Sequence, residues 1–202
     1  MKLRWLLLIM TFSFAGAAHG GGMTGAPDIG RIEPKSVTLF SRHRYKDKYE
    51  GYGRSAFSFE HGMRSDVGVE APRNDYDLEY GSISLDGDSD WLTVTMVTDD
   101  RSRIKDLGEM NWSEVYHVPV LPASPEPRQG VRFPRQGESF EESSDGQVTK
   151  AVVGHVYVVH TKDSDTDLYA MFRVERLDPN DTCVISWKVV PSPEQYPAQG
   201  VK

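Results

Sequence analysis

The sequence predicts a mostly β protein, built as a single antiparallel β-sandwich or open barrel with a C-terminal three-strand meander and at most one or two short helical turns. Residues 147–190 hold three apolar runs, GHVYVVH, LYAMFRV and CVISWKVV, separated by the turn-rich pieces TKDSDTD and LDPND. This pattern is typical of antiparallel strands joined by hairpins. The 18 Gly and 12 Pro residues indicate a turn-rich chain, and a hydrophobic content of 38% is enough for one packed core.

Residues 1–18 have the pattern of a Sec-type signal peptide. Lys2 and Arg4 precede the apolar run Trp5–Ala15, and small residues suited to cleavage occupy positions 15–18. We therefore expect export to the periplasm or the extracellular space. After this segment no apolar stretch approaches the roughly 18 residues that a membrane span needs, so we expect a soluble mature protein.

The rest of the chain is expected to form one domain. Gly-rich residues 19–35 predict a flexible leader, residues 36–190 a single β-rich domain, and residues 191–202 a tail. Pro and polar residues over 119–146 predict a long crossover inside the domain. The meander that follows is too short to bury a core alone, and Cys183 is the only cysteine, so no intrachain disulfide can support it. We therefore expect it to pack on the first half of the chain.

Alternating apolar residues predict the strands of the first half. SVTLF at 36–40 predicts one strand, and SAFSFEHG at 55–62 predicts a second. In the second strand, Phe57 and Phe59 are expected on one face and Ala56 on the other, because successive side chains of a strand point to opposite faces.

The next strands surround an acidic loop. WLTVTMV at 91–97 is the clearest strand of this half, and its expected partner is Ile83–Leu85, across the loop DGDSD. Alternation changes phase at Gly81, where a β-bulge would explain the shift. Residues 101–118 break the period-two pattern, and Asn111–Glu114 within them predicts one short helical turn.

In the meander the same alternation predicts which residues of each strand share a face. Leu168, Ala170, Phe172 and Val174 are expected to share one face of their strand. The lone thiol of Cys183 is expected to be buried and inert on its strand.

Charge is concentrated in one segment. The formal net charge is −7, and residues 55–100 hold eleven acidic residues against two basic ones. An acidic lobe argues against a nucleic-acid partner, because contact with phosphates requires the opposite sign. It is compatible with cations, basic partners or solubility alone.

Two acidic D-x-D-x-D triplets lie in connections between predicted strands. They are Asp86, Asp88, Asp90 and Asp163, Asp165, Asp167. Carboxylates at alternate positions of a tight loop can converge on Ca²⁺, so these residues are candidate metal ligands. Neither triplet has the Gly and Glu that an EF-hand loop requires. The alternative is that they are turn formers that keep hairpin tips soluble, because Asp is a common turn residue.

A second candidate surface combines aromatic and basic residues. Tyr45, Tyr49 and Tyr52 lie among the basic residues of RHRYKDKYEGYGR. Aromatic rings interleaved with positive charge can bind nucleic acid or stack on sugars. The signal-peptide pattern argues against nucleic acid, so these residues are candidates for a sugar-stacking surface. The alternative is an exposed edge segment whose charges discourage pairing with other strands.

Catalytic motifs are weak in this sequence. It contains neither G-x-S-x-G nor S-x-x-K, and His155 and His160 fall on opposite faces of one strand. A carboxylate pair such as that of a glycosidase stays open, with Glu60 beside His61 as one example.

We therefore expect an exported, soluble, non-catalytic binding or structural protein of unknown ligand, without a cofactor and with a carbohydrate or protein partner. The alternatives are a secreted hydrolase with a carboxylate-based site and a calcium-binding envelope protein that uses its acidic hairpin tips.

Overall fold

The computed structural model describes the strands of the expected domain and parts of their connections. The described residues are 33–45, 53–64, 76–83, 88–94, 101–111, 118–121, 123, 136, 146–164 and 166–193. No helix within these ranges is long and apolar enough to cross a membrane.

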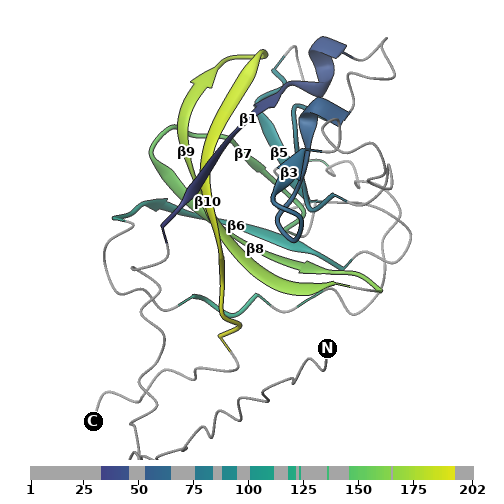
Figure 1. Ribbon diagram of the computed structural model, residues 1–202. Helices are drawn as coiled ribbons and strands as arrows, with labels where there is room; N and C mark the ends of the chain where they lie inside the picture. Colours follow the sequence, from purple (N-terminus) through teal and green to yellow (C-terminus); the bar gives the residue numbers. More distant parts are fainter. Residues whose placement is uncertain are drawn as a thin grey trace, which may run out of the picture.

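Two antiparallel five-stranded sheets make up the described part of the chain (Figure 1). The long-strand sheet has the order β1 (Lys35–Phe40), β10 (Thr182–Val190), β9 (Asp167–Asp178), β8 (His155–Lys162), β6 (Arg103–Glu109). The short-strand sheet has the order β3 (Met63–Arg64), β2 (Ala56–Ser58), β4 (Leu78–Tyr80), β5 (Trp91–Val94), β7 (Val148–Lys150). The described strands form a sandwich and do not close a barrel, so the predicted fold class is confirmed.

The predicted meander is β8, β9 and β10. Phe172 of β9 lies opposite Tyr157 of β8 on one side and opposite Trp187 of β10 on the other. A register shift between Val184 and Ile185 marks a β-bulge in the β9–β10 pair. β1 then pairs with the outer edge of β10, so the first described strand lies beside the last one.

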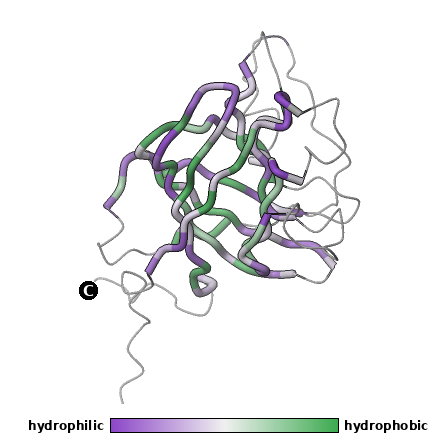
Figure 2. The backbone as a smooth tube through the Cα atoms, turned by 45° about the horizontal axis from the view of Figure 1, so that its top comes forward, coloured by the Kyte–Doolittle hydropathy of each residue, from purple (hydrophilic) through white to green (hydrophobic). Residues whose placement is uncertain are grey.

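The core lies between the two sheets, as the alternation predicts. Phe57 and Phe59 from the short-strand sheet pack against Phe172 and Trp187 from the long-strand sheet, with ring centroids 5.1–6.1 Å apart. Hydrophobic stretches follow the crossing strands at the centre of the molecule, while the hairpin ends are hydrophilic (Figure 2). The meander therefore packs on the first half of the chain, because each sheet supplies one wall of the same core.

A second, smaller cluster covers the outer face of the long-strand sheet. Val118 and Leu121, which follow β6 in the chain, pack there against Val156, Val158 and Met171. Both faces of this sheet are therefore buried in part, which explains why its strands are apolar on both sides.

The structure corrects two details of the strand prediction. β5 pairs with β4 itself, so that Tyr80 lies opposite Leu92, and Ile83 belongs to no strand. Residues Arg103–Glu109 form β6 although their sequence does not alternate. A bulge between Asp106 and Glu109, with Gly108 at a φ of 76°, accounts for the broken alternation.

The predicted helical turn falls largely outside the described residues, which include only Asn111 of Asn111–Glu114. The helical turns that the structure describes lie elsewhere: the 3-10 turn η2, Arg42–Tyr45, follows β1 after one residue, and residues 53–55 are helical just before β2.

Gly81 ends β4 in a conformation that favours glycine. Its φ is 71°, its N–H donates to the Trp91 carbonyl, and its own carbonyl accepts from His43 N–H. A Cβ at this position would lie 2.3 Å from Ser41 Oγ and 2.9 Å from Ser41 Cα. The close approach of the two backbones therefore leaves no space for any side chain.

We expect Gly81→Ala to destabilise the protein more than Gly108→Ala. Both positions have positive φ and share a left-handed backbone cost of about 1–2 kcal/mol. A Cβ at Gly108 would meet nothing within 4 Å, whereas the contact with Ser41 should add about 1–3 kcal/mol at Gly81. Urea unfolding of the two variants measures the difference, and equal losses would show that the Ser41 contact carries no cost.

Candidate functional site

The aromatic candidates are only partly within the described residues. Tyr49 and Tyr52 lie outside them, and the backbone of Tyr45 closes the turn η2. The predicted sugar-stacking surface therefore stays a prediction.

The first acidic triplet is tied to the β9–β10 turn. Asp90 Oδ1 accepts from the Tyr80 hydroxyl at 2.5 Å and from Asn180 N–H at 2.8 Å. Asp88 forms an ion pair with Lys150 of β7. Asp86 lies outside the described residues. Asp90 thus joins the short-strand sheet to the β9–β10 turn, whereas Asp88 binds a residue of the short-strand sheet itself.

The second triplet forms the β8–β9 turn. Asp163 Oδ1 accepts from Thr166 N–H at 2.6 Å, a contact within the turn, and Asp167 begins β9. Asp165 lies outside the described residues. Asp163 therefore acts as a turn former, as the alternative to the calcium prediction supposed.

The described carboxylates of the two triplets lie at opposite ends of β9, whose ends are the β8–β9 turn and the β9–β10 turn (Figure 1). β9 has 12 residues, so at about 3.3 Å per residue the two turns are roughly 35 Å apart along the strand. Within the described ranges, no group of three or more His, Cys, Asp or Glu side chains could hold a metal ion. The described carboxylates of the two loops thus share no contact, and the calcium site stays a prediction.

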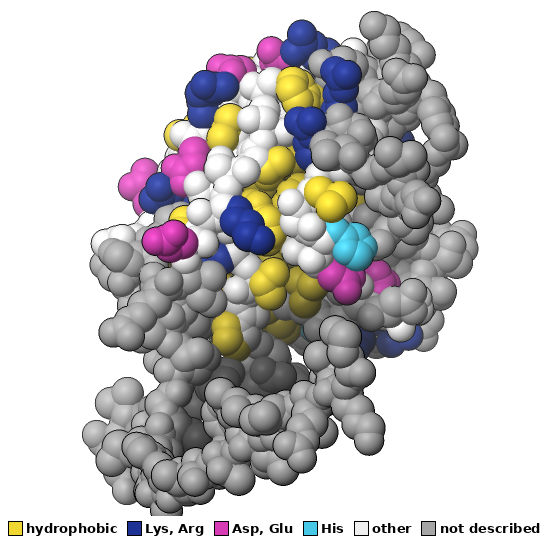
Figure 3. Space-filling view, viewed as in Figure 1, with side chains coloured by type: hydrophobic (Ala, Val, Ile, Leu, Met, Phe, Trp, Pro, Cys, Tyr) yellow, Lys and Arg dark blue, Asp and Glu magenta, His cyan; other side chains and the backbone are white. Residues whose placement is uncertain are grey.

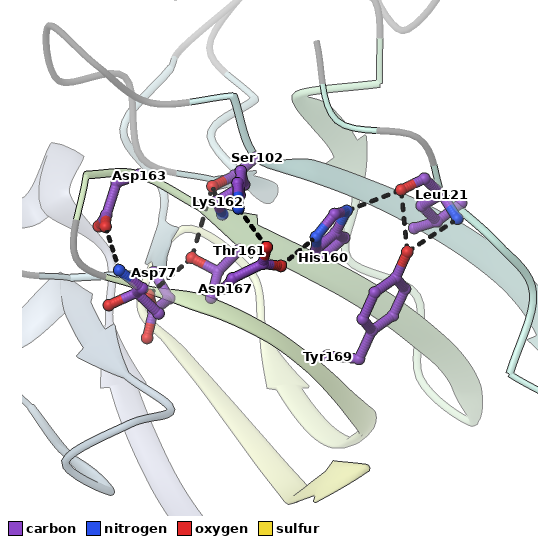
Figure 4. A network of polar contacts seen from close by, with 10 residues as sticks. Asp77, Ser102, Leu121, His160, Thr161, Lys162, Asp163, Asp167 and Tyr169 are labelled. Atoms are coloured by element: carbon purple, nitrogen blue, oxygen red, sulfur yellow. Dashed lines mark hydrogen bonds and ion pairs between the residues drawn. The ribbon is translucent and has the colours of Figure 1, made fainter. Parts of the chain in front are cut away.

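The richest set of polar contacts surrounds the β8–β9 turn (Figure 4). We call this set the β8–β9 polar network; its members are Asp77, Ser102, Leu121, His160, Thr161, Lys162, Asp163, Thr166, Asp167 and Tyr169. It is our candidate functional site, because it gathers a buried carboxylate, a histidine and an ion pair at one end of the sandwich.

Asp77 connects the two sheets within this network. It directly precedes β4, and its Oδ1 accepts from the Thr161 hydroxyl of β8 at 2.7 Å. Its Oδ2 accepts from Phe59 N–H at 2.6 Å. Burial raises the pKa of Asp77, and hydrogen bonds from Thr161, Phe59, Glu60 and Ser58 oppose that increase. Asp77 is 5% exposed and both its carboxylate oxygens accept hydrogen bonds, so it connects the two sheets.

Asp167 and Lys162 form an ion pair across the β8–β9 hairpin. Burial acts to raise the pKa of Asp167, but hydrogen bonds and charges from Lys162 and His160 outweigh it and lower the pKa below its ordinary value. The carboxylate therefore stays ionised over the physiological pH range.

His160 extends the network to the outer face of the long-strand sheet. Its Nε2 lies 2.9 Å from Asp167 Oδ1, and its Nδ1 lies 2.7 Å from the Leu121 carbonyl oxygen. The ring stacks on Tyr169 with a centroid distance of 4.3 Å. Because both ring nitrogens are engaged, neither can activate a nucleophile in this arrangement.

His155 has a separate partner at the other end of β8. Its Nδ1 lies 2.9 Å from Asp106 Oδ2, and Asp106 Oδ1 accepts from Gly108 N–H at 2.7 Å. The two histidines therefore bind different carboxylates and share no site.

A second buried carboxylate lies on the outer face of the short-strand sheet. Glu79 accepts two hydrogen bonds of 3.0 Å from Arg42 and one of 3.1 Å from the Ser55 hydroxyl. Burial raises the pKa of Glu79, and the charge of Arg42 opposes this increase. Cys183 is buried as predicted, and burial likewise raises the pKa of its thiol, which makes it a poor nucleophile.

The described surface carries charges of both signs close together. On the face shown in Figure 3, basic and acidic side chains alternate at the upper left. Arg173 pairs with Glu175 at 2.8 Å, and Arg176 pairs with Asp178 at 3.5 Å. This part of the surface therefore offers no extended field of one sign to a charged partner.

Comparisons with known proteins add no family to this geometry. No family model, curated protein or solved structure matches the chain.

The sequence prediction did not single out Asp77, Thr161 or Glu79. Asp77 and Glu79 flank Leu78 in a stretch where the apolar residues carry the strand signal, and acidic residues at such positions are usually exposed. Hydrogen bonds from Thr161, in the other half of the chain, and from Phe59, Glu60 and Ser58 compensate its burial.

We expect Asp77→Asn to lower the free energy of unfolding by about 1–3 kcal/mol, because an amide offers one acceptor oxygen where several donors converge. Asp178→Asn is the matched control. Asp178 also accepts from a threonine hydroxyl, that of Thr182 at 2.9 Å, but it is half exposed. Urea unfolding measures both variants, and an equally small effect at the two positions would contradict the role of Asp77.

The stability difference between wild type and Asp77→Asn should depend on pH with a defined sign. Because the pKa of Asp77 is raised above 3.8 in the folded protein, the native state holds this proton more tightly than the unfolded chain does. The stability contribution is therefore complete below pH 3.8 and is lost as the pH rises through the raised pKa. The stability of wild type relative to Asp77→Asn should accordingly increase as the pH falls toward 3.8.

Proposed function

We propose that this chain is an exported, non-catalytic binding or structural module. The observation that supports the absence of catalysis most directly is that the ionisable groups of the β8–β9 polar network bind other groups of the protein. Asp77 holds the two sheets together, Asp167 is paired with Lys162, and His160 has an acceptor at each ring nitrogen. A general acid or base must have a free position toward its substrate, and in this network those positions are filled by the protein itself.

Export is proposed from the first 18 residues, whose positive start, apolar run and small residues have the signal-peptide pattern. A two-sheet sandwich with mixed surface charge suits a protein that works outside the cytoplasm as a rigid support for loops. The ligand-binding part of the proposal rests on Tyr45, Tyr49 and Tyr52, with a carbohydrate as the proposed ligand.

Export can be tested by expressing the full chain in a bacterial host and sequencing the N-terminus of the protein recovered outside the cytoplasm. We expect the mature chain to begin near His19. A Leu7→Arg, Leu8→Arg variant should stay in the cytoplasm uncleaved, because charges in the apolar run abolish the signal. Cytoplasmic wild-type protein that keeps Met1 would contradict export.

Binding without turnover can be tested with soluble cello-, xylo- and chito-oligosaccharides. A ligand at about a hundredfold excess over its Kd should raise the melting temperature by roughly 5 °C or more. Replacement of Tyr45, Tyr49 and Tyr52 by Ala should abolish the shift, whereas replacement by Phe should retain it, because Phe preserves the stacking face.

Chromatography of the oligosaccharides after incubation reports turnover. Shorter products would overturn the proposed absence of catalysis. Unchanged melting temperatures with every probe would exclude these sugars as partners.

A further inference from the structure

The segment Val118–Leu121, which we call the strap, lies on the outer face of the long-strand sheet. Val118 and Leu121 are buried there against Val156, Val158 and Met171, and Val120 between them is 58% exposed. The strap therefore turns two apolar side chains toward the sheet and shields an apolar patch from water.

Two side chains hold the backbone of the strap at Leu121 (Figure 4). The Tyr169 hydroxyl donates to the Leu121 carbonyl at 3.0 Å and accepts from Leu121 N–H at 3.3 Å. His160 Nδ1 lies 2.7 Å from the same carbonyl oxygen. The backbone of Leu121 is thus held by the side chains of Tyr169 and His160, whose rings stack on each other.

The two contacts of the His160 ring require two protons. A carbonyl oxygen and an ionised carboxylate are acceptors only, and a neutral imidazole carries a single N–H. If that hydrogen is on Nδ1, the lone pair of Nε2 faces Asp167; if it is on Nε2, the lone pair of Nδ1 faces the Leu121 carbonyl. Only the imidazolium satisfies the Leu121 carbonyl and Asp167 together.

Charged groups of both signs surround the ring. Asp167 of β9 contacts the ring directly, and Lys162 of β8 shares the Asp167 carboxylate. Arg103 of β6 is the register partner of His160, and its guanidinium donates to the Ser102 carbonyl at 3.1 Å. Tyr169 presents an uncharged hydroxyl, and Leu121 of the strap presents only its backbone.

We propose that His160 is a pH-sensitive latch for the strap. The protonated ring binds the Leu121 carbonyl and keeps the strap closed on the sheet. On deprotonation the ring keeps its Nε2 hydrogen, because the bond to the Asp167 carboxylate is charge-assisted and stronger than the bond to a carbonyl. The Nδ1 lone pair then faces the Leu121 carbonyl, so the Leu121 end of the strap is released. The apolar patch of Val156, Val158 and Met171 then becomes accessible.

Amide hydrogen exchange at Leu121 tests the latch in the full mature protein. Protection factors, corrected for the intrinsic rate, are measured on both sides of the range in which histidines titrate, at about pH 5 and about pH 8. We expect protection to fall by about tenfold at the higher pH, the size of the loss of one charge-assisted hydrogen bond. Equal protection at the two pH values overturns the proposal.

Two variants distinguish release of the strap by His160 from a general loss of stability at the higher pH. His160→Gln can hydrogen-bond but cannot change charge, so the protection of Leu121 should become independent of pH. His155→Gln is the matched control, because His155 lies on the same strand and also binds a carboxylate, Asp106, but is not bonded to the strap. It should retain the wild-type pH dependence, and its loss there would overturn the assignment to His160.

Nitrogen chemical shifts of the wild-type His160 ring provide a measurement that needs no variant. We expect both ring nitrogens to be protonated while Leu121 is protected, and one of them to lose its proton as protection is lost. A neutral ring in a protein whose Leu121 amide stays protected would overturn the proposal.

Discussion

The contact between aromatic rings of the two sheets is the interaction on which the rest of the structure depends. The strands of the short-strand sheet have only two to four residues, too few to be stable without a packed face. Phe57 and Phe59 of that sheet pack against Phe172 and Trp187 of the longer strands. Each buried ring of this size contributes on the order of 1.5–3 kcal/mol, more than the roughly 1 kcal/mol net of a typical hydrogen bond. The aromatic core therefore holds the sheets together, and the polar contacts fix how they are aligned.

Polar connections between the sheets lie at both ends of the sandwich. At one end Asp77 accepts from Thr161, and at the other Asn180 Oδ1 accepts from Ser89 N–H at 2.8 Å. Asn180 adopts a φ of 58°, a left-handed conformation that Asn tolerates better than most residues. A buried carboxylate and a left-handed asparagine are both unfavourable alone, and each is compensated by a partner more than eighty residues away. They specify the alignment of the sheets because a different alignment would leave them without those partners.

The fold could be predicted where residues alternate without interruption. The meander and its faces follow from period-two patterning, and Phe57 and Phe59 lie in the core as that pattern requires. β6 could not be found in this way, since the bulge at Gly108 puts charged residues where alternation would continue. The partner of β5 was wrongly assigned because Ile83 is as apolar as a strand residue, whereas Gly81 already ends the strand two residues earlier.

The site was harder to predict because its contacts are long-range. Two triplets with the same spacing lie at different turns, and spacing within a loop says nothing about which turns meet. His160 gave no sequence signal for its contact with Leu121, because its partner there is a main-chain carbonyl and any residue type could supply one.

The pairing of β1 with β10 has a consequence for how the chain acquires its structure. Lys35 lies opposite Trp187 and Phe40 opposite Thr182, so the two strands are separated by more than 140 residues. During synthesis β1 emerges long before its partner, and its backbone groups must stay bonded to water until the last strand is made. Contacts between such distant residues slow folding, because the loop entropy is lost before any contact is gained. The topology thus delays closure of the long-strand sheet until β10 has been made.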